Sequence, residues 1–452
     1  MNRWMTQLEA WFDQVTATLW PRLNGDEALT LKLDAEDQDY IRFNGGRVRQ
    51  ATAVRQIRLK LDYQANQRRC SQTVTLTGQV APDRVMIETS LNLLRQECQV
   101  LPPDPWITAL QNHGQSRVHH AGVLPAVADL VEEWVSLGRE YDFTGLLAQG
   151  TVVRANRNSL GQAHWFSAEG LFIDYSLYTV NPDGQNKAVK GFYAGSSWDR
   201  ERYAAQWATQ VMALKRLQQP DYTVKPGDYR VYLAPAAVDD LVGMLAWGGS
   251  SYQAYREGRC ALGKLFDGKA TLSPRFTLRE NFDLGLAPRF NSLGEWPPDS
   301  LTVVDQGQPG TLLISSRSAT EYGLCGNAAE PGGEGLRSPE LLPGDLDNDA
   351  ILKTLDTGLY LGNLHYLNWS DVQEARITGM TRYACFRVEN GEITAPIGDV
   401  RFDESLYRLF GPALEALTTQ TERCLSTDTY GQRSLGGSQV PGVLLGAFRI
   451  TL

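Results

Sequence analysis

The sequence has few of the residues that most often bind transition metals. Its 452 residues include five histidines and six cysteines, and no two cysteines form a Cys-x-x-Cys motif. His119 and His120 are adjacent, so their side chains diverge on a regular helix or strand, while His113 and His164 are isolated. No histidine pair therefore has the spacing of a zinc site. The scattered cysteines indicate free thiols in a reducing compartment.

Long apolar runs and an excess of basic residues are also absent. No stretch approaches the ~18 consecutive apolar residues that span a bilayer. The formal net charge of −9 disfavours non-specific binding to nucleic acid or to an anionic membrane, because both reward a basic surface. The first residues lack a basic segment followed by an apolar one, so no signal peptide is expected. These features predict a cytoplasmic protein whose partners are neither nucleic acid nor membrane.

The composition is that of a folded chain with more than one core. Apolar residues make up 42% of the sequence and charged residues 21%, and the length exceeds what one ordinary core supports. A proline-rich break at 101–105 and a second linker at 220–227 divide the chain. We expect three units, which are an N-terminal domain (1–100), a middle domain (106–220) and a C-terminal domain (227–452).

The first two units mix helical and strand periods. Apolar residues at three- and four-residue steps predict a helix that ends before Pro21; they are Trp4, Leu8, Trp11, Phe12, Val15 and Leu19. Alternation over residues 28–80 predicts an antiparallel sheet with one solvated face. Within the strand-rich block 151–180, Asn158-Ser159-Leu160-Gly161 is predicted to be a turn, because no base is tied to Ser159 that would make it a nucleophile.

The C-terminal unit begins with a strand at 229–234, after which Pro235 starts a helix. Strands at 301–304 and 311–314 are predicted to pair around a Gly-Gln-Pro-Gly turn. The glycine- and proline-rich segment 323–344 is predicted to be a mobile surface loop.

A tight hairpin is the strongest local prediction. Asn390-Gly391 separates the apolar runs 383–388 and 393–397. A type I′ turn needs positive φ at both central residues, which Asn and Gly tolerate best.

The order of short motifs around this hairpin resembles the C-terminal domain of the TldD/PmbA family. PGD at 343–345 is followed by a helix, GLYL at 358–361, a long loop and VENGEI at 388–393. The resemblance extends along nearly the whole chain. It implies an α+β fold with two N-terminal α/β lobes and a larger, mostly β C-terminal domain. It also implies a link to metal-dependent peptide cleavage, and dimers that enclose a shared cavity.

At the helix after Pro235, this chain differs from the pattern of the family it resembles. Catalytic members carry His-Glu-x-x-x-His there, with a distant Cys as a further zinc ligand. The matching stretch here has no histidine and begins with Asp239-Asp240, which we expect to cap or solvate the helix start. Cys424 lies near a Gly-Gln at 431–432, but its spacing is shifted and no histidine accompanies it. No catalytic or metal-binding residue is assigned, and zinc is expected only in a histidine-bearing partner.

Peptide-binding candidates lie in a stretch predicted to be a loop. His365, Tyr366, Asn368 and Trp369 combine rings and an amide that suit contacts with a peptide backbone. Ordinary surface packing is the alternative for these residues.

Three functional readings follow. In the first, the chain is a PmbA/TldE-like subunit without zinc, in a heterodimer with a TldD-like relative that cleaves unfolded or leader peptides. The second is a metal-independent peptide-binding or scaffolding homodimer, and the third is a peptidase with an unrecognised nucleophile. For either dimer, the stripe Trp4-Leu8-Trp11 is a candidate subunit contact, and packing within the chain is its alternative.

Overall fold

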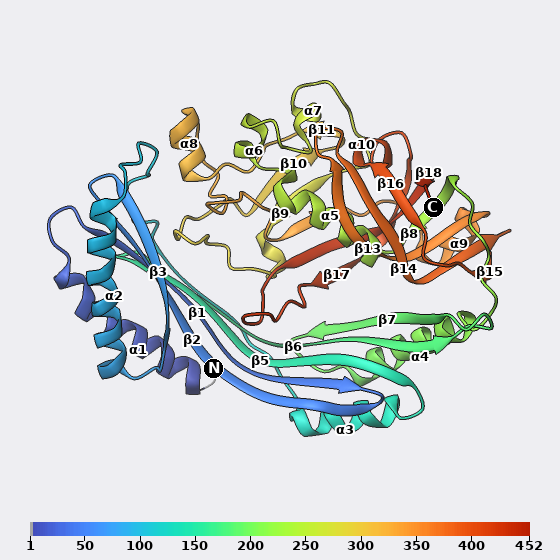
Figure 1. Cartoon of the computed structure of the whole chain (residues 1–452), viewed down its shortest axis with the longest axis horizontal. Helices are drawn as coiled ribbons and strands as arrows, with labels where there is room; N and C mark the ends of the chain where they lie inside the picture. Colours follow the sequence, from blue (N-terminus) through green and yellow to red (C-terminus); the bar gives the residue numbers. More distant parts are fainter. Residues whose placement is uncertain (1–2) are drawn as a thin grey trace.

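The computed structural model describes residues 3–452 as two β-sheets with associated helices (Figure 1). Seven described strands form the N-terminal sheet, in the order β3-β2-β1-β5-β6-β4 with β7 paired to β6. Eleven form the C-terminal sheet. The predicted α+β fold class is confirmed. The strands of the first sheet are β1 (Ala28–Asn44), β2 (Arg47–Ala65), β3 (Arg68–Leu76), β4 (Gln115–His120), β5 (Asp142–Asn158), β6 (Ala163–Val180) and β7 (Asn186–Gly195).

The N-terminal sheet has one apolar face and one polar face, and β1 shows why. Its odd positions from Leu29 to Ala35, and again Ile41 and Phe43, are buried under helices. Its even positions include Lys32, Asp34 and Glu36, which point to the opposite face because side chains alternate along a strand. That polar face is turned toward the C-terminal domain.

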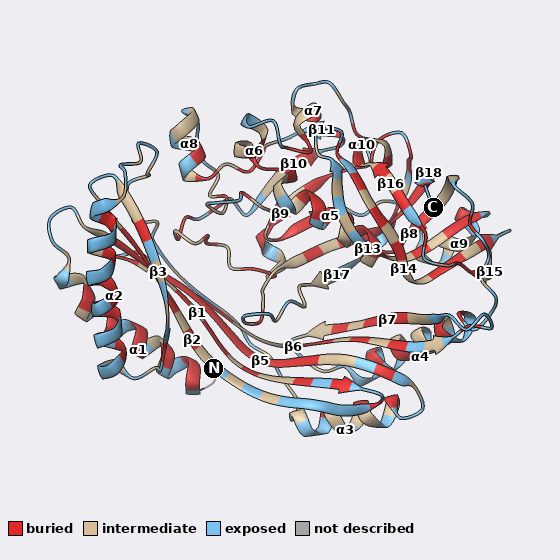
Figure 2. Ribbon diagram, viewed as in Figure 1, coloured by how far each residue is buried: buried red, intermediate tan, exposed pale blue. Residues whose placement is uncertain are grey.

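Two pairs of helices cover the apolar face, and each pair builds a core of its own. Helices α1 (Arg3–Leu19) and α2 (Val80–Val100) pack at one end, and α3 (Val127–Gly138) and α4 (Arg200–Arg216) pack at the other. The two predicted N-terminal lobes therefore share one continuous sheet. Figure 2 shows buried residues along the central strands and exposed residues on the outer sides of these helices.

The apolar stripe of α1 lies inside this first core. Trp4, Leu8 and Trp11 are each less than a tenth exposed and pack with α2 and the sheet. The stripe had two interpretations, a subunit contact or packing within the chain. The structure shows packing within the chain. Within residues 3–452, no helix is both long and apolar enough to cross a membrane.

The C-terminal sheet closes on itself. β18 pairs with both β16 and β8, so strands β8, β13, β14, β16 and β18 form a ring. The strands are β8 (Gly227–Leu233), β9 (Leu278–Asn281), β10 (Ser300–Asp305), β11 (Gln308–Pro309), β12 (Pro339–Leu341), β13 (Gly358–Asp371), β14 (Arg376–Glu389), β15 (Glu392–Pro396), β16 (Arg401–Ser405), β17 (Leu414–Leu425) and β18 (Gly437–Ile450).

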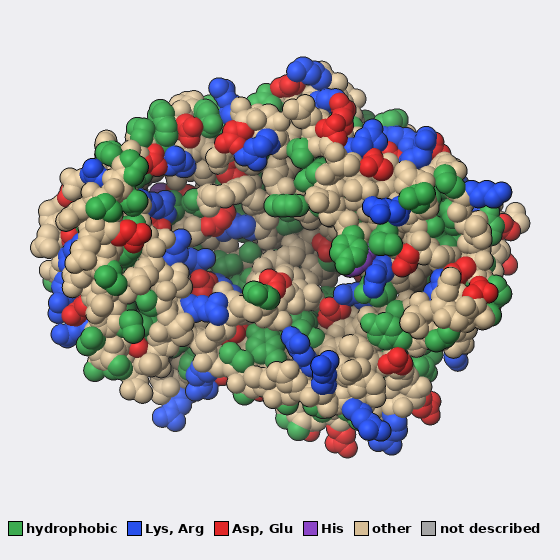
Figure 3. Space-filling model, in the orientation of Figure 1, with side chains coloured by type: hydrophobic (Ala, Val, Ile, Leu, Met, Phe, Trp, Pro, Cys, Tyr) green, Lys and Arg blue, Asp and Glu red, His purple; other side chains and the backbone are tan. Residues whose placement is uncertain are grey.

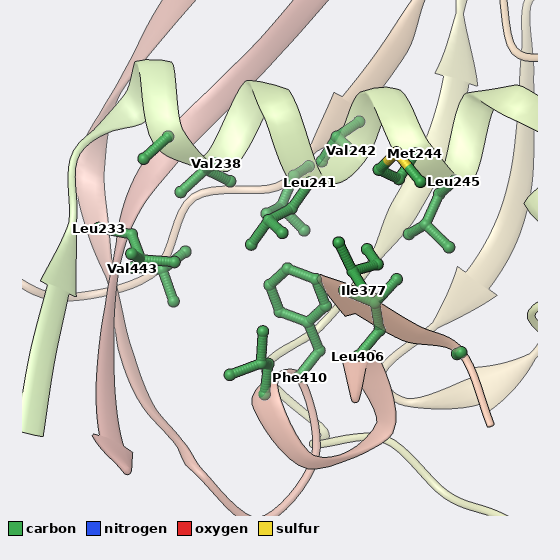
Figure 4. Close-up of a cluster of buried hydrophobic side chains, with 14 of the residues drawn as sticks. Leu233, Val238, Leu241, Val242, Met244, Leu245, Ile377, Leu406, Phe410 and Val443 are labelled. Carbon is green, nitrogen blue, oxygen red and sulfur yellow. The ribbon is translucent and has the colours of Figure 1, made fainter. Parts of the chain in front are cut away.

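Helix α5 (Pro235–Met244) packs against this ring along one stripe. Pro235 occupies the first turn, where its missing N–H leaves no bond unmade. Val238, Leu241 and Val242 point toward side chains from the ring and its flanking segments, among them Phe410 (Figure 4). The three- and four-residue steps of this stripe leave Asp239 and Gly243 on another side of the helix.

Two predictions for residues 301–344 are wrong. The hairpin turn after β10 lies at Gln306-Gly307, both with positive φ, and not at the Gly-Gln-Pro-Gly stretch. The segment 323–344 is not simply a surface loop, because Glu334 is fully buried within it. The Glu334 carboxylate accepts hydrogen bonds from the Ser251 hydroxyl at 2.7 Å and the Ser315 backbone N–H at 2.8 Å.

Both predicted turns with special residues are confirmed. Asn390 and Gly391 have φ of 53° and 78°, and the flanking residues Glu389 and Glu392 pair across the turn. Ser159 lies in the β5–β6 turn, where its hydroxyl accepts a hydrogen bond from the Leu29 N–H at 3.2 Å.

Replacing Gly391 with valine should destabilise the C-terminal domain by about 1–3 kcal/mol, because a β-branched residue tolerates positive φ poorly. A Cβ at Gly391 would also lie 3.2 Å from the Lys353 Cα. Chemical denaturation measures the change, and Glu392→Val, one residue further into the strand, is the matched control. Equal midpoints for Gly391→Val and the wild type would contradict the turn assignment.

Candidate functional site

A cavity of about 530 Å³ lies between the two halves of the chain. The N-terminal sheet contributes Lys32, Asp34 and Arg154 from its polar face, and α5 contributes Asp239 and Gly243. Figure 3 shows the visible face of the molecule hollowed near its centre, between the two domains. The volume falls in the range of ligand-binding sites, which is about 300–1,000 Å³.

The acidic pair on α5 lies in the second turn of the helix, so the prediction that it caps or solvates the helix start is wrong. Asp239 lines the cavity, and its Oδ1 accepts a hydrogen bond from the Ser438 hydroxyl at 2.5 Å. Asp240 points elsewhere and accepts a hydrogen bond from the Leu364 N–H at 3.3 Å. Burial raises the pKa of Asp239, and burial together with the charge of Asp239 raises the pKa of Asp240 to about 7.

Cys424 lies beside this helix despite its shifted spacing in the sequence. It is on β17 directly opposite Ser438 of β18, the residue that donates to Asp239. Burial and the nearby carboxylates of Asp239 and Glu422 raise the pKa of the thiol, so the thiolate that binds a metal is disfavoured. Among the described residues, no group of three or more His, Cys, Asp or Glu is placed to hold a metal.

The two arginines that line the cavity are committed to the protein itself. Arg154 lies with its Nε 3.1 Å from Asp34 and donates through Nη2 to the Arg433 carbonyl at 2.8 Å. Arg337 donates to the backbone carbonyls of Phe290 at 2.8 Å and Arg289 at 3.0 Å. Both side chains therefore hold walls of the cavity in place.

One wall is the segment 426–436, here called the strap, which joins β17 to β18. Its backbone crosses to the polar face of the N-terminal sheet, where the Arg433 N–H donates to the Glu36 carboxylate at 2.8 Å. The Arg433 guanidinium donates to the Gln38 amide oxygen at 3.2 Å and the Gly170 carbonyl at 2.8 Å. Burial lowers the pKa of Arg433 to about 10, and its guanidinium stacks on Phe172.

The sequence analysis did not predict that the strap contacts the N-terminal sheet. The available signal was Glu36, a carboxylate on the polar face of a strand whose cross-strand neighbour is Gln56 and not a basic residue. Such a charge needs a partner from elsewhere when it is buried.

The four peptide-binding candidates lie on β13, so the prediction of a loop is wrong. A bulge between His365 and Asn368 places Tyr366 at positive φ and leaves it 77% exposed. The rings of His365 and Tyr366 lie 4.3 Å apart, whereas Trp369 packs against the C-terminal core. None of the four lines the cavity. Peptide binding by them stays a prediction.

Two serine–histidine contacts bear on the third functional hypothesis, a peptidase with an unrecognised nucleophile. The Ser116 hydroxyl lies 2.9 Å from His164 Nδ1, and the Ser167 hydroxyl lies 3.0 Å from His119 Nδ1. The Nε2 of each histidine is buried with no partner among the described residues, so no carboxylate orients either ring. His164 also stacks on Phe290 at 5.2 Å. These contacts pack β4 against β6 and do not form a catalytic dyad.

Comparisons with known proteins identify a family through one model and the fold through solved structures. A family model described as the PmbA/TldA metallopeptidase C-terminal domain matches residues 226–452, which is half of the chain. No curated protein matches the chain.

Solved structures of low sequence identity share the fold over nearly the full length. A protein from Thermotoga maritima described as a modulator of a DNA gyrase is 14% identical, with a TM-score of 0.76 over 98% of this chain and 100% of its own. TldE from Thermococcus kodakarensis is 13% identical, with a TM-score of 0.76 over 94% and 97%. A Bacteroides thetaiotaomicron protein, also described as a modulator of DNA gyrase, is 13% identical, with a TM-score of 0.78 over 100% and 99%.

Replacing Arg433 with methionine should cost on the order of 3 kcal/mol of unfolding free energy. It removes one of the two arginine charges that act on buried Glu36, and the guanidinium that donates to the Gln38 amide oxygen and the Gly170 carbonyl. Denaturation measures the loss. The matched control is Arg55→Met on the same sheet, whose side chain is 61% exposed beside Asp37, and which should cost about 1 kcal/mol or less. Adding Glu36→Gln to Arg433→Met should restore part of the loss. Equal losses for Arg433→Met and Arg55→Met would contradict the role given to the strap.

The pKa of Asp240 predicts a pH-dependent stability. The folded carboxyl holds its proton up to about pH 7, whereas the unfolded one releases it near 3.8, so this group's contribution falls as pH rises through that window. Asp240→Asn should therefore gain stability relative to the wild type between pH 4 and pH 8, on the order of 2–4 kcal/mol. Unfolding free energies measured across this range test it, and a difference that does not change with pH would contradict it.

Proposed function

The chain belongs to the TldD/PmbA family, and from that premise we propose that it is a histidine-free, TldE-like subunit of a peptide-cleaving assembly. The observation that carries the proposal is the surface that α5 presents to the cavity. Catalytic members, by the resemblance of their sequences, carry their zinc ligands on this helix. Here the residues of α5 that line the cavity are Asp239 and Gly243, and Ala246 lines it just after the helix ends.

The residues beside α5 do not fit a zinc ion. Asp239 already accepts a hydrogen bond from Ser438, and the nearby Cys424 thiol is held in its protonated form by burial. Zinc in proteins is bound by thiolates, neutral imidazoles and carboxylates in sets of three or four. We therefore derive no step of peptide hydrolysis from this chain and assign that step to a histidine-bearing partner.

The role that remains for this chain is to hold peptide. Its cavity offers polar groups from both domains and apolar surface from residues such as Phe290 and Leu435. The strap bonds the C-terminal domain to the N-terminal sheet at one wall of the cavity, and these contacts support a preformed site. A preformed site lowers the ordering cost of binding.

A second candidate is a metal-independent peptide-binding or scaffolding homodimer. It is favoured by the cavity being lined within a single chain, which needs no second subunit to complete it. For either role we propose a cytoplasmic location, supported by six cysteines that are all free thiols.

Measurements on the purified chain, alone and combined with a histidine-bearing relative from the same host, separate these roles. The chain alone should contain no stoichiometric zinc and should not cleave unfolded peptides, and the mixture should cleave them. A relative with its histidines replaced is the control for the mixture. Cleavage by the chain alone, or about one zinc per chain lost on replacing His119 and His120, would contradict the subunit role. Failure to associate with any relative would favour the scaffold.

A further inference from the structure

Three basic side chains lie together on the polar face of the N-terminal sheet, and we call Lys32, Arg58 and Lys60 the basic cluster. Lys32 lines the cavity and lies directly opposite Lys60 in the register of β1 and β2. Residues paired in this way have Cβ atoms about 4.5–5.5 Å apart. Arg58 is the next residue of β2 on the same face, and its Nη1 would lie 3.0 Å from a Cβ placed at Gly431 of the strap. The basic cluster therefore extends from the cavity wall to the strap.

The carboxylate closest in register to this cluster is shared between two cations. Asp34 lies opposite Arg58 but forms its ion pair with Arg154, whose Nε is 3.1 Å from Oδ1. Its Oδ2 lies 3.6 Å from Lys32 Nζ, which is an ion pair but too long for a hydrogen bond. The N–H donors of Lys32 are therefore free to bind a ligand.

The second carboxylate on this part of the sheet is also engaged elsewhere. Asp62 lies two residues from Lys60 on β2 and accepts two hydrogen bonds from Arg69, each at 2.6 Å. Within residues 3–452, no hydrogen bond or ion pair involves the side chain of Arg58 or Lys60. The basic cluster thus has more positive charge than the carboxylates around it neutralise.

The pairing of Lys32 with Lys60 lowers the stability of the sheet, because like charges directly opposite each other on one face repel. A neutral or acidic residue at either position would preserve the strands and remove the repulsion. Natural sequences depart from local rules of this kind mainly at functional sites. A ligand explains the pairing, whereas the fold alone does not.

We propose that the basic cluster binds a carboxylate of a peptide held in the cavity, either its C-terminus or an aspartate or glutamate side chain. Two ammonium groups and a guanidinium supply charge and N–H donors, and the planar fork of Arg58 matches the two oxygens of a carboxylate. The lining residues Asp239 and Glu330 belong to the C-terminal domain, so they disfavour an anion at that wall and not at this one.

The source of the carboxylate follows from the charge of the whole chain. A net charge of −9 disfavours nucleic acid, which would need a basic surface much larger than three side chains. A peptide carries single carboxylates that a small cluster can bind. The peptide context rests on the proposed function, and the anion preference does not.

The test compares three pentapeptides that carry an uncharged fluorescent label. The first has a central glutamine and an amidated C-terminus, the second has a central glutamate, and the third has a free C-terminal carboxylate. Fluorescence anisotropy at low ionic strength should show at least one carboxylate peptide binding the wild-type chain about fivefold more tightly than the first. The peptide that gains affinity identifies the source of the carboxylate.

Variants assign this gain to the basic cluster. Lys32→Met and Lys60→Met keep the length of the side chain and should each remove most of the gain. Lys215→Met is the matched control, because it removes the same charge from an exposed position of α4, which covers the other face of the sheet. This variant should retain the gain.

Stability separates a ligand-binding role of Lys60 from a structural one. Removing one of two opposed ammonium groups relieves their repulsion, so Lys60→Met should unfold at the same denaturant concentration as the wild type or at a higher one. A lower midpoint would show that Lys60 supports the fold and would overturn the argument for a ligand.

Equal affinities of the wild type for all three peptides would overturn the proposal, and so would a gain that survives in both Lys32→Met and Lys60→Met. If no peptide binds, calorimetric titration with citrate, a tricarboxylate, separates the site from the proposed function. Citrate binding that is lost in Lys60→Met would keep the anion site and discard the peptide role. The absence of citrate binding would overturn the site itself.

Discussion

The two domains meet through buried polar groups, and Arg433 makes several of these contacts. Arg433 leaves the C-terminal domain on the strap and bonds the polar face of the N-terminal sheet at Glu36, Gln38 and Gly170. A sheet face with this many polar groups cannot be covered by an apolar surface, because each buried carboxylate or amide needs a partner. The strap supplies those partners, and in doing so it encloses the cavity that Gln432 and its neighbours line.

Helix α5 divides its residues between the core of the C-terminal domain and the cavity. The stripe that includes Val238, Leu241 and Val242 is part of the core of the C-terminal domain, so these positions are constrained by packing. Asp239 and Gly243 line the cavity instead of the core, so core packing constrains them less. Residues on this side can therefore change their chemistry while the fold is kept, which is consistent with function residing in sites that are carried by a common fold.

The charges around the cavity divide into those that build it and those that remain free. Arg154, Arg337 and Asp34 hold backbone segments or each other. Asp239 and Glu330 each accept a hydrogen bond through one oxygen, and no donor within residues 3–452 reaches the other. Counting lysines, arginines and carboxylates along the lining would suggest a neutral site. Following each contact shows instead that the two arginines are bound within the protein, whereas Lys32 lies 3.6 Å from Asp34 in an ion pair.

The sequence by itself determined the features that depend on near neighbours. The α1 stripe, the two-residue alternation of β1, the start of α5 at Pro235 and the turn at Asn390-Gly391 all follow from local periodicity or from backbone preference. The family resemblance also drew attention to α5, and in the structure this helix lines the candidate cavity. For the peptide-binding candidates, however, local composition indicated a loop, and cross-strand pairing with β14 made that stretch a bulged strand.

Only the tertiary structure decided the contacts between residues far apart in the chain. Arg433 meets Glu36 across 397 residues of the chain, and Asp239 meets Ser438, beside Cys424, across 199 residues. The same holds for Glu334, whose burial fixes a segment that its glycine content marked as a surface loop. Such contacts are set by the closing of the C-terminal ring and by the need of buried polar groups for partners, and neither leaves a periodic signal in the sequence.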